Sequence, residues 1–234
     1  MAKKKLPERY KSYLKDNLTK KMYKNVIEEY TSIAKVYEDR WAKYLASTEE
    51  AILQQLKLKG KEAILDAGCG TGTLITAIQK KFKHKGKIYG FDITPAMLEL
   101  AEYKLSKDRF NKSLQLELAH CENFSAKKNS IDIVIFSSVM HHLPHPEHAI
   151  KEFQRVLKNR GKLILVDYCT DYPTTKIYDL VARVFHKAHH KAYSSEYVEE
   201  LLKKHKFKIT TFKTWKATPL LGVMLFSAKK CYND

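Results

Sequence analysis

Three glycines at alternate positions follow a short apolar run in the first third of the chain. The segment Asp66–Gly72 reads Asp-Ala-Gly-Cys-Gly-Thr-Gly, and a helical pattern begins directly after it. Glycines permit positive φ angles and let a ligand approach the backbone without a Cβ in its way. Exposed amides at the start of a helix favour a carboxylate or a phosphate. The G-x-G-x-G spacing differs from the dinucleotide pattern and from a P-loop, and by itself it is also compatible with a plain structural turn.

Two acidic residues lie where apolar runs end. Asp66 closes the run before the glycines, where a charge needs a partner. Asp92 closes the next run, about 20 residues further on, which is the position of the acid that binds ribose hydroxyls in nucleotide-binding α/β folds. Thr94 and Pro95 then suit the cap and first position of a helix. A simple capping or surface role for Asp92 remains an alternative.

These residues lie within an alternating β-α pattern. Short runs rich in Ile, Leu and Val occupy 63–67, 88–92, 114–118, 131–136 and 162–167, and helical segments occupy 72–81, 95–106 and 146–158. The pattern predicts a parallel sheet with helices on both faces. Two further β-like runs, 207–214 and 220–228, are predicted to pair antiparallel at one edge.

Helical patterns flank this sheet-forming region. Residues 25–60 read as two helices, the second starting near Ser47 and Thr48. An insert at 170–192 contains an amphipathic helix whose face over 177–185 is apolar, and we expect it to act as a lid on the edge where such sheets bind ligands. We predict a single domain over 25–234, preceded by a basic arm over 1–24.

Charge is the unusual bulk property of the chain. The 234 residues carry a net charge of +17, and the first 24 hold nine Lys or Arg against two acids. Such a surface attracts nucleic acid, anionic lipid or acidic substrates, although it can equally serve only solubility. No apolar run is long enough to span a bilayer, no secretory signal is present and the four cysteines form no C-x-x-C pair. We therefore expect a cytoplasmic protein that holds no metal.

With these motifs in order, the chain resembles the class I S-adenosylmethionine-dependent methyltransferases, in the small-molecule group that includes the quinone-biosynthesis C-methyltransferases. Similarity runs from about Ile33 to Lys230. The resemblance implies a Rossmann-like, doubly wound, seven-stranded α/β sheet with an antiparallel C-terminal hairpin. The matching segments are Ile33–Tyr37, Asp66–Gly72, Asp92, Ala119–Asn123, Asn129–Val134, Ser137–Pro144 and Ala149–Lys158.

The resemblance also implies S-adenosylmethionine as the methyl donor, S-adenosylhomocysteine as the product, and a set of cofactor contacts. His120 replaces the acid that usually contacts the adenine amino group, and Val139–His142 replaces the Gly-x-Arg-Asn loop usual in quinone-pathway enzymes. The expected contacts are Tyr37, Asp66, Gly68, Cys69, Gly70, Thr71, Gly72, Asp92, Ile93, Met97, His120, Cys121, Glu122, Ser137 and Ser138.

Two histidines are candidates for catalysis. Methyl transfer is an in-line displacement, so the enzyme chiefly aligns the nucleophile with the methyl group, and a base near neutral pKa helps where the nucleophile carries a proton. His141 and His142 follow the fourth strand, where the methyl group should point. A packed loop residue is the alternative for either one. The nearby His145 and His148 raise a metal interpretation that we do not favour.

The sequence does not determine which molecule accepts the methyl group. The apolar face of 177–185 and the basic arm favour a small or amphipathic acceptor, lipid-like or quinone-like, and peripheral contact with an anionic membrane. RNA or protein methylation is an alternative that uses the same positive charge, although no RNA-binding module is evident. A cofactor-binding homologue without turnover is the second alternative. The sequence does not indicate an oligomeric state.

Overall fold

The computed structural model describes residues 16–107 and 113–231. A seven-stranded sheet runs through it in the order β3-β2-β1-β4-β5-β7-β6. The five strands from β3 to β5 are parallel, and β7 pairs antiparallel with β5 on one side and β6 on the other. The strands are β1 (Ile64–Ala67), β2 (Ile88–Asp92), β3 (Leu114–Leu118), β4 (Ile131–Ser137), β5 (Leu157–Tyr168), β6 (Phe207–Lys216) and β7 (Gly222–Lys230). The predicted fold class is confirmed, including the antiparallel C-terminal pair.

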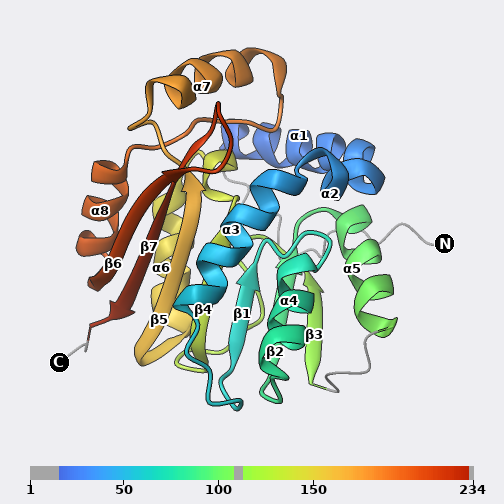
Figure 1. Cartoon of the computed structure of the whole chain (residues 1–234), viewed down its shortest axis with the longest axis vertical. Coiled ribbons are helices and arrows are strands. Elements are labelled where there is room, and N and C mark those ends of the chain that lie inside the picture. The colour runs from blue at the N-terminus through green and yellow to red at the C-terminus, as the bar shows by residue number, and fades with distance from the viewer. Residues whose placement is uncertain (1–15, 108–112, 232–234) are drawn as a thin grey trace.

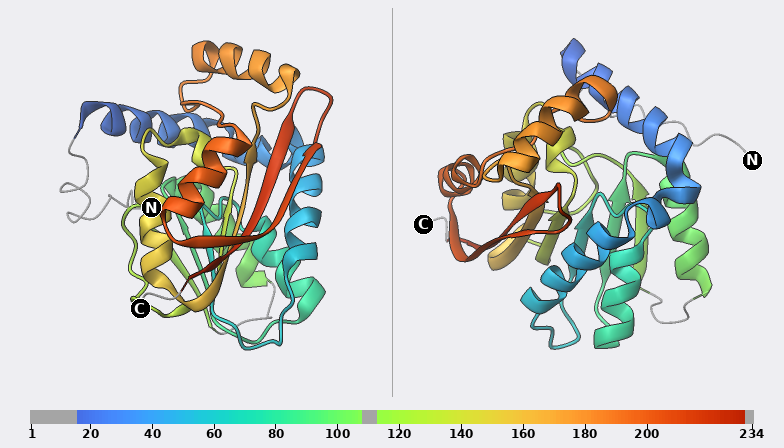
Figure 2. Two further views of the ribbon diagram at one scale, coloured as in Figure 1. Left: turned by 90° about the vertical axis from the view of Figure 1, so that its left-hand side faces the viewer. Right: turned by 45° about the horizontal axis from the view of Figure 1, so that its top comes forward.

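Helices cover both faces of the sheet and the edge beyond the carboxyl ends of its parallel strands. Helices α3, α4 and α5 lie on one face and α6 and α8 on the other, while α1 and α7 cross the top of the molecule (Figure 1; Figure 2). The helices are α1 (Asn17–Ile33), α2 (Tyr37–Arg40), α3 (Ala42–Gln55), α4 (Thr73–Phe82), α5 (Pro95–Lys107), α6 (Pro146–Val156), α7 (Pro173–Phe185) and α8 (Ser195–Lys204), with short 3-10 turns at Ala34–Val36 and Met140–His142.

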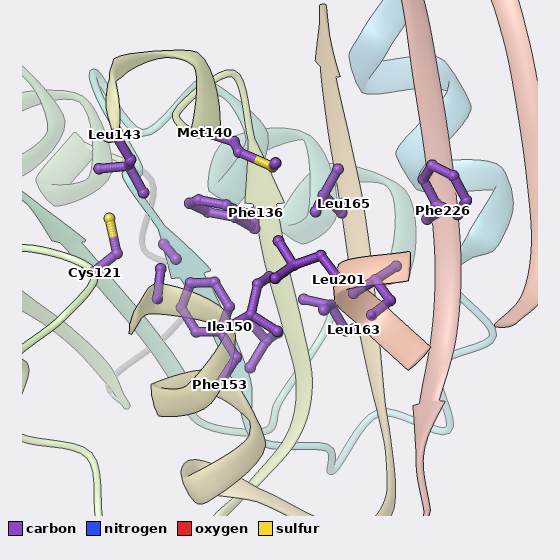
Figure 3. Close-up of a cluster of buried hydrophobic side chains, with 14 of the residues drawn as sticks. Cys121, Phe136, Met140, Leu143, Ile150, Phe153, Leu163, Leu165, Leu201 and Phe226 are labelled. Carbon is purple, nitrogen blue, oxygen red and sulfur yellow. The ribbon is translucent and has the colours of Figure 1, made fainter. Parts of the chain in front are cut away.

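The core between the sheet and helices α6 and α8 consists of large aromatic and aliphatic side chains. Phe136 of β4, Phe153 of α6 and Phe226 of β7 are all at least 99% buried (Figure 3). The rings of Phe136 and Phe153 meet edge to face at 4.9 Å. Burying each such side chain stabilises the fold by roughly 1.5–3 kcal/mol. This packing fixes the carboxyl end of β4, from which the candidate histidine loop begins.

The N-terminal segment differs from the expectation in two places. Helix α1 begins at Asn17, where the Asp16 carboxylate accepts a hydrogen bond from the Thr19 amide, so residues 17–24 belong to a helix that packs on the domain. The remainder of the predicted basic arm lies outside the described residues. The expected start of a helix near Ser47 is wrong, because α3 already begins at Ala42. The Thr48 hydroxyl donates back to the Tyr44 carbonyl inside that helix instead of capping a new one.

Helix α7 is amphipathic as predicted, but its apolar face points away from the protein. Thr175, Asp179 and Ala182 face inward and are buried, whereas the apolar face over 177–185 is exposed to solvent. Within the described residues, no helix is long and apolar enough to cross a membrane.

Candidate active site

A cavity opens beyond the carboxyl ends of β1, β2 and β4, beneath helix α1. An adjoining hollow lies toward α3 and the start of α4. Such a crevice beside the strand ends is where open α/β sheets bind ligands. The two spaces share five lining residues, which makes them one continuous cleft: Tyr37, Gly68, Gly70, Ser137 and Ser138.

The glycine turn forms the floor of this cleft. Gly68 has a φ of +80°, and a Cβ there would lie 2.3 Å from a methyl carbon of Val139, so only glycine fits without displacing the loop after β4. Gly70 has a φ of +52° and would meet no described atom within 4 Å, because it faces the open cleft. Cys69 and Thr71 line the adjoining hollow, while Gly72 takes the left-handed conformation that starts α4. The loop thus leaves bare backbone facing the cleft.

Asp66 carries a buried carboxylate that lacks one hydrogen-bond donor within the described part of the chain. Its side chain is 97% buried in the hollow, and its Oδ2 has no hydrogen-bond partner among the described residues. Burial, together with the nearby charge of Asp92, raises the pKa of Asp66 from 3.8 to about 7. A buried acceptor that lacks a donor is costly. The amino group of the methionine portion of S-adenosylmethionine would supply both the donor and the positive charge, so this position fits the cofactor.

Asp92 is held rigidly at the end of β2. Its Oδ2 accepts a hydrogen bond from the Gly70 amide at 2.9 Å and its Oδ1 accepts one from the Thr94 amide at 2.8 Å. Burial raises the pKa of Asp92, and these amide donors oppose the increase. Each carboxylate oxygen keeps a further lone pair that can accept a hydrogen bond from a ribose hydroxyl. The structure therefore brings the glycine loop and the predicted ribose acid into direct contact.

The segments that follow β2 and β3 line the far end of the cavity. Ile93, Met97, His120 and Cys121 all contribute to the lining, whereas Glu122 does not. Burial lowers the pKa of His120 to about 4, so this ring is neutral at pH 7. A neutral ring at this end suits the uncharged adenine portion of the cofactor.

Glu122 instead lies behind this end of the cavity. Its Oε2 is 3.7 Å from the Nδ1 atom of His148 on α6, and burial raises its pKa.

The end of β4 places two serines in the middle of the cleft. Ser138 has a φ of +59°, which is unusual for a residue other than glycine and is typical of strained backbone at functional sites. Its amide donates to the Val166 carbonyl, and its hydroxyl lies 2.9 Å from the hydroxyl of Tyr44. Tyr44 is a buried core residue, while Tyr37 lines both parts of the cleft.

His142 lines the cavity and its tautomer follows from its partners. The Nδ1 atom is 2.6 Å from the Ala188 carbonyl, which can only accept, so Nδ1 carries the proton. The Nε2 atom then accepts a hydrogen bond from the Tyr30 hydroxyl at 3.0 Å. Burial, with a smaller contribution from the adjacent His141, lowers the pKa of His142 well below 6.5. His142 is thus a neutral acceptor at neutral pH.

Tyr30 is a lining residue that sequence reasoning did not assign to the site. The structure places it with Tyr23 and Val26 on the cavity side of α1. Burial raises the pKa of the Tyr30 phenol well above 10, so it remains a donor. The signal available in the sequence was a tyrosine on a helix preceding the glycine loop.

His141, the other catalytic candidate, is not among the cavity-lining residues. Its Nδ1 lies 2.7 Å from Oδ1 of Asp167 on β5, and both side chains are buried. His189 is similarly engaged, with Nε2 at 2.8 Å from Asp179 of α7. Within residues 16–107 and 113–231, no three His, Cys, Asp or Glu side chains are grouped so that they could hold a metal ion. The histidine-rich segments supply buried hydrogen-bond pairs.

Comparison with known proteins agrees with this geometry. Residues 58–217 match the family model described as a methyltransferase domain. The chain is 30% identical over 172 residues to a demethylmenaquinone methyltransferase of Lactobacillus johnsonii, covering 71% of this chain and 70% of that protein. It is 29% identical over 126 residues to the ubiquinone/menaquinone biosynthesis C-methyltransferase UbiE of Citrifermentans bemidjiense, covering 54% of this chain and about half of that relative.

A solved SAM-dependent methyltransferase from Methanosarcina mazei has the same fold, with a TM-score of 0.63 at 21% identity, covering 78% of this chain and 98% of that one. The chain therefore belongs to the methyltransferase domain family. It is an S-adenosylmethionine-dependent methyltransferase of class I, and the expected likeness to the quinone-biosynthesis group is confirmed.

Proposed function

We propose that the enzyme methylates a quinone-like acceptor, an amphipathic aromatic molecule with a ring hydroxyl next to the carbon that receives the methyl group. The observation that carries this proposal is the Tyr30–His142 pair, a donor–acceptor couple held at the wall of the cofactor cavity. The names of the relatives support the same acceptor class, since they are demethylmenaquinone and ubiquinone/menaquinone methyltransferases.

The cofactor end of the cleft is assigned residue by residue. When bound, S-adenosylmethionine supplies an electrophilic methyl group on a sulfonium. Asp66 offers a carboxylate oxygen to the amino group, Asp92 offers two oxygens to the ribose hydroxyls, and the bare Gly70 backbone lets the ligand approach closely. Tyr37 presents an aromatic ring to the cleft, and an aromatic face favours a nearby cation. These residues bind and orient the donor before any bond changes.

The acceptor end needs a group that holds a hydroxyl and provides a place for its proton. The Tyr30 oxygen donates to His142 Nε2 and keeps lone pairs that can accept a hydrogen bond from the acceptor hydroxyl. When the ring carbon takes the methyl group from the sulfonium and the S–CH3 bond breaks, the acceptor hydroxyl becomes a carbonyl: its proton would pass to the Tyr30 oxygen while the phenol proton passes to Nε2. The proton on the methylated ring carbon is then lost and the carbonyl oxygen is reprotonated by the reverse transfer, which restores the aromatic hydroquinone. His142 is unprotonated at neutral pH, so this path is open without a prior ionisation. His141 and Asp167 pack beside this pair and position it from behind.

The rest of the molecule suits an acceptor with a hydrophobic tail. The insert over 170–192 carries an exposed apolar face, and the net charge of +17 favours contact with anionic surfaces. We therefore place the enzyme in the cytoplasm at the periphery of a membrane. Nothing in the described structure favours RNA or protein as the acceptor, nor a homologue without turnover.

The test is methyl transfer from labelled S-adenosylmethionine to a short-tailed naphthoquinol, followed by mass spectrometry of the product. A ring-methylated product supports the proposal, and a protein that binds cofactor but leaves the quinol unmethylated contradicts it. His142→Ala should lower kcat by about 10²–10⁴-fold, the usual contribution of a general base. His145→Ala is the matched control, because that partly exposed histidine lies outside the cavity.

A further inference from the structure

Helix α7 has the reverse of the usual surface-helix arrangement. At 3.6 residues per turn, its large apolar side chains share an arc of roughly 140°, and the buried residues Thr175, Asp179 and Ala182 lie opposite this arc. The apolar residues are instead exposed to solvent, with these exposed fractions: Ile177 64%, Leu180 64%, Val181 49%, Val184 74% and Phe185 76%. A contiguous exposed patch of this kind marks an interaction surface.

A sixth apolar side chain lies on a segment that α7 contacts. Leu220, 61% exposed, is in the loop between β6 and β7. Its carbonyl accepts a hydrogen bond from the Thr175 hydroxyl, which itself accepts one from the Gly222 amide. Both α7 and the tip of this hairpin reach the top of the molecule in Figure 1. The apolar surface is therefore anchored by buried hydrogen bonds.

Most of the charges along the segment that contains α7 are positive. Residues 172–195 contain four Lys or Arg and a single acid, Asp179. That acid is buried and is paired with Arg183 and His189, so its charge is compensated within the protein. Lys176 and Lys187 are exposed at the two ends of the helix. The face thus consists of an apolar strip flanked by cations, the pattern of a helix that lies in the interface of an anionic bilayer.

We propose that the apolar face of α7, with Leu220, docks the enzyme on an anionic lipid surface. The docking proposal rests on the proposed function in one respect only, namely that this lipid surface is the source of the methyl acceptor. A second copy of the chain is a poorer occupant, because a symmetric contact would bring the flanking cations of both copies together. Lipid headgroups of negative charge neutralise the same cations.

The segment that follows α7 links this face to the cavity wall. The Lys187 carbonyl accepts a hydrogen bond from the Asn25 side chain of α1, and the Ala188 amide donates to Glu29 of the same helix. The Ala188 carbonyl accepts the Nδ1 proton of His142. Docking of α7 therefore brings the cavity close to the bilayer surface, where a tailed acceptor resides.

The experiment measures co-sedimentation of the full chain with vesicles of phosphatidylglycerol and phosphatidylcholine, compared with phosphatidylcholine alone. Wild type should bind the anionic vesicles and release as salt rises. Val184→Ser/Phe185→Ser should lower the partition coefficient at least about tenfold, because two side chains no longer enter the lipid. Tyr103→Ser, which removes a 62% exposed ring from α5, should bind like wild type. Circular dichroism and methyl transfer to the short-tailed quinol should be unchanged in all of them.

Three results would overturn the docking proposal. One is equal vesicle binding by wild type and Val184→Ser/Phe185→Ser. Another is wild-type dimerisation that this double variant abolishes, which would assign the face to a second copy. The third is binding to bulk tRNA that depends on the same two residues. The docking proposal and the proposed function can fail separately. Vesicle binding without quinol methylation contradicts only the proposed quinone-like acceptor. Quinol methylation without vesicle binding contradicts only the docking proposal.

Discussion

Asp66 should make cofactor binding depend on pH in a specific way. Its pKa lies at about 7 because the carboxyl is buried beside Asp92 and its Oδ2 lacks a described partner. Only the ionised form pairs with the cofactor's amino group, so binding below pH 7 must first release the Asp66 proton. Affinity should be flat above pH 7 and fall toward tenfold per pH unit below it. At pH 5.5 the dissociation constant should be about thirtyfold higher than at pH 8.

The same burial predicts an effect on stability without cofactor. A folded pKa of about 7 against an ordinary 3.8 means that Asp66 favours folding at low pH, and this contribution is lost as pH rises from 3.8 to about 7. The difference corresponds to about 4 kcal/mol. Asp66→Asn should therefore unfold at a higher denaturant concentration than wild type at pH 8. The difference between the two unfolding midpoints should become smaller toward pH 5.

Isothermal titration with S-adenosylhomocysteine at half-unit steps between pH 5.5 and 8.5 measures the binding effect. Asp66→Asn should bind about 10–150-fold more weakly at pH 8, because a charged hydrogen bond is lost, and its affinity should not vary with pH. Glu49→Gln alters another acid in the same hollow and should keep the wild-type slope. A wild-type affinity that is constant over this range, or an Asp66→Asn variant that retains the pH dependence, would refute the assignment of Asp66 to the cofactor's amino group.

Gly68→Ala would place a Cβ 2.3 Å from a methyl group of Val139, so cofactor affinity should fall at least about tenfold. Adding Val139→Ala to this variant should restore part of the lost affinity in the same titration. Tyr30→Phe removes the donor to His142 and should lower kcat for quinol methylation about 10-fold or more while cofactor affinity is unchanged; an unaltered kcat would remove Tyr30 from the mechanism. Phe153→Ala should lower the free energy of unfolding by about 3–5 kcal/mol in urea denaturation, and a loss below 1 kcal/mol would contradict the packing described.

The sequence predicted the sheet and most of the cofactor end because both depend on local patterns. Strand ends followed by glycines or an acid identify Asp66, Gly68 and Asp92 without knowledge of tertiary packing. The parallel pairing of β1 with β2 then brings the two strand ends together, and the Gly70 amide bonds Asp92 as a result. Where the position of a site residue follows from the order of the strands, the sequence pattern is enough to predict that position.

The acceptor end could not be derived in the same way. Two adjacent histidines look alike in sequence, and only the tertiary partners decide that His142 lines the cavity while His141 is directed to Asp167. Tyr30 reaches the cavity because α1 crosses the sheet edge, a contact 112 residues away in the chain. The apolar stripe of α7 predicted an amphipathic helix, but its outward direction is set by the buried Asp179 and its bonds to His189 and the Ala192 amide.

The most direct test of the central claim uses purified protein, labelled S-adenosylmethionine and a short-tailed demethylated naphthoquinol. We expect one methyl group on a ring carbon of the quinol, one equivalent of S-adenosylhomocysteine, and strong loss of both in His142→Ala while cofactor binding persists. Binding of the cofactor without any labelled quinol, or a His142→Ala variant as active as wild type, would contradict this claim.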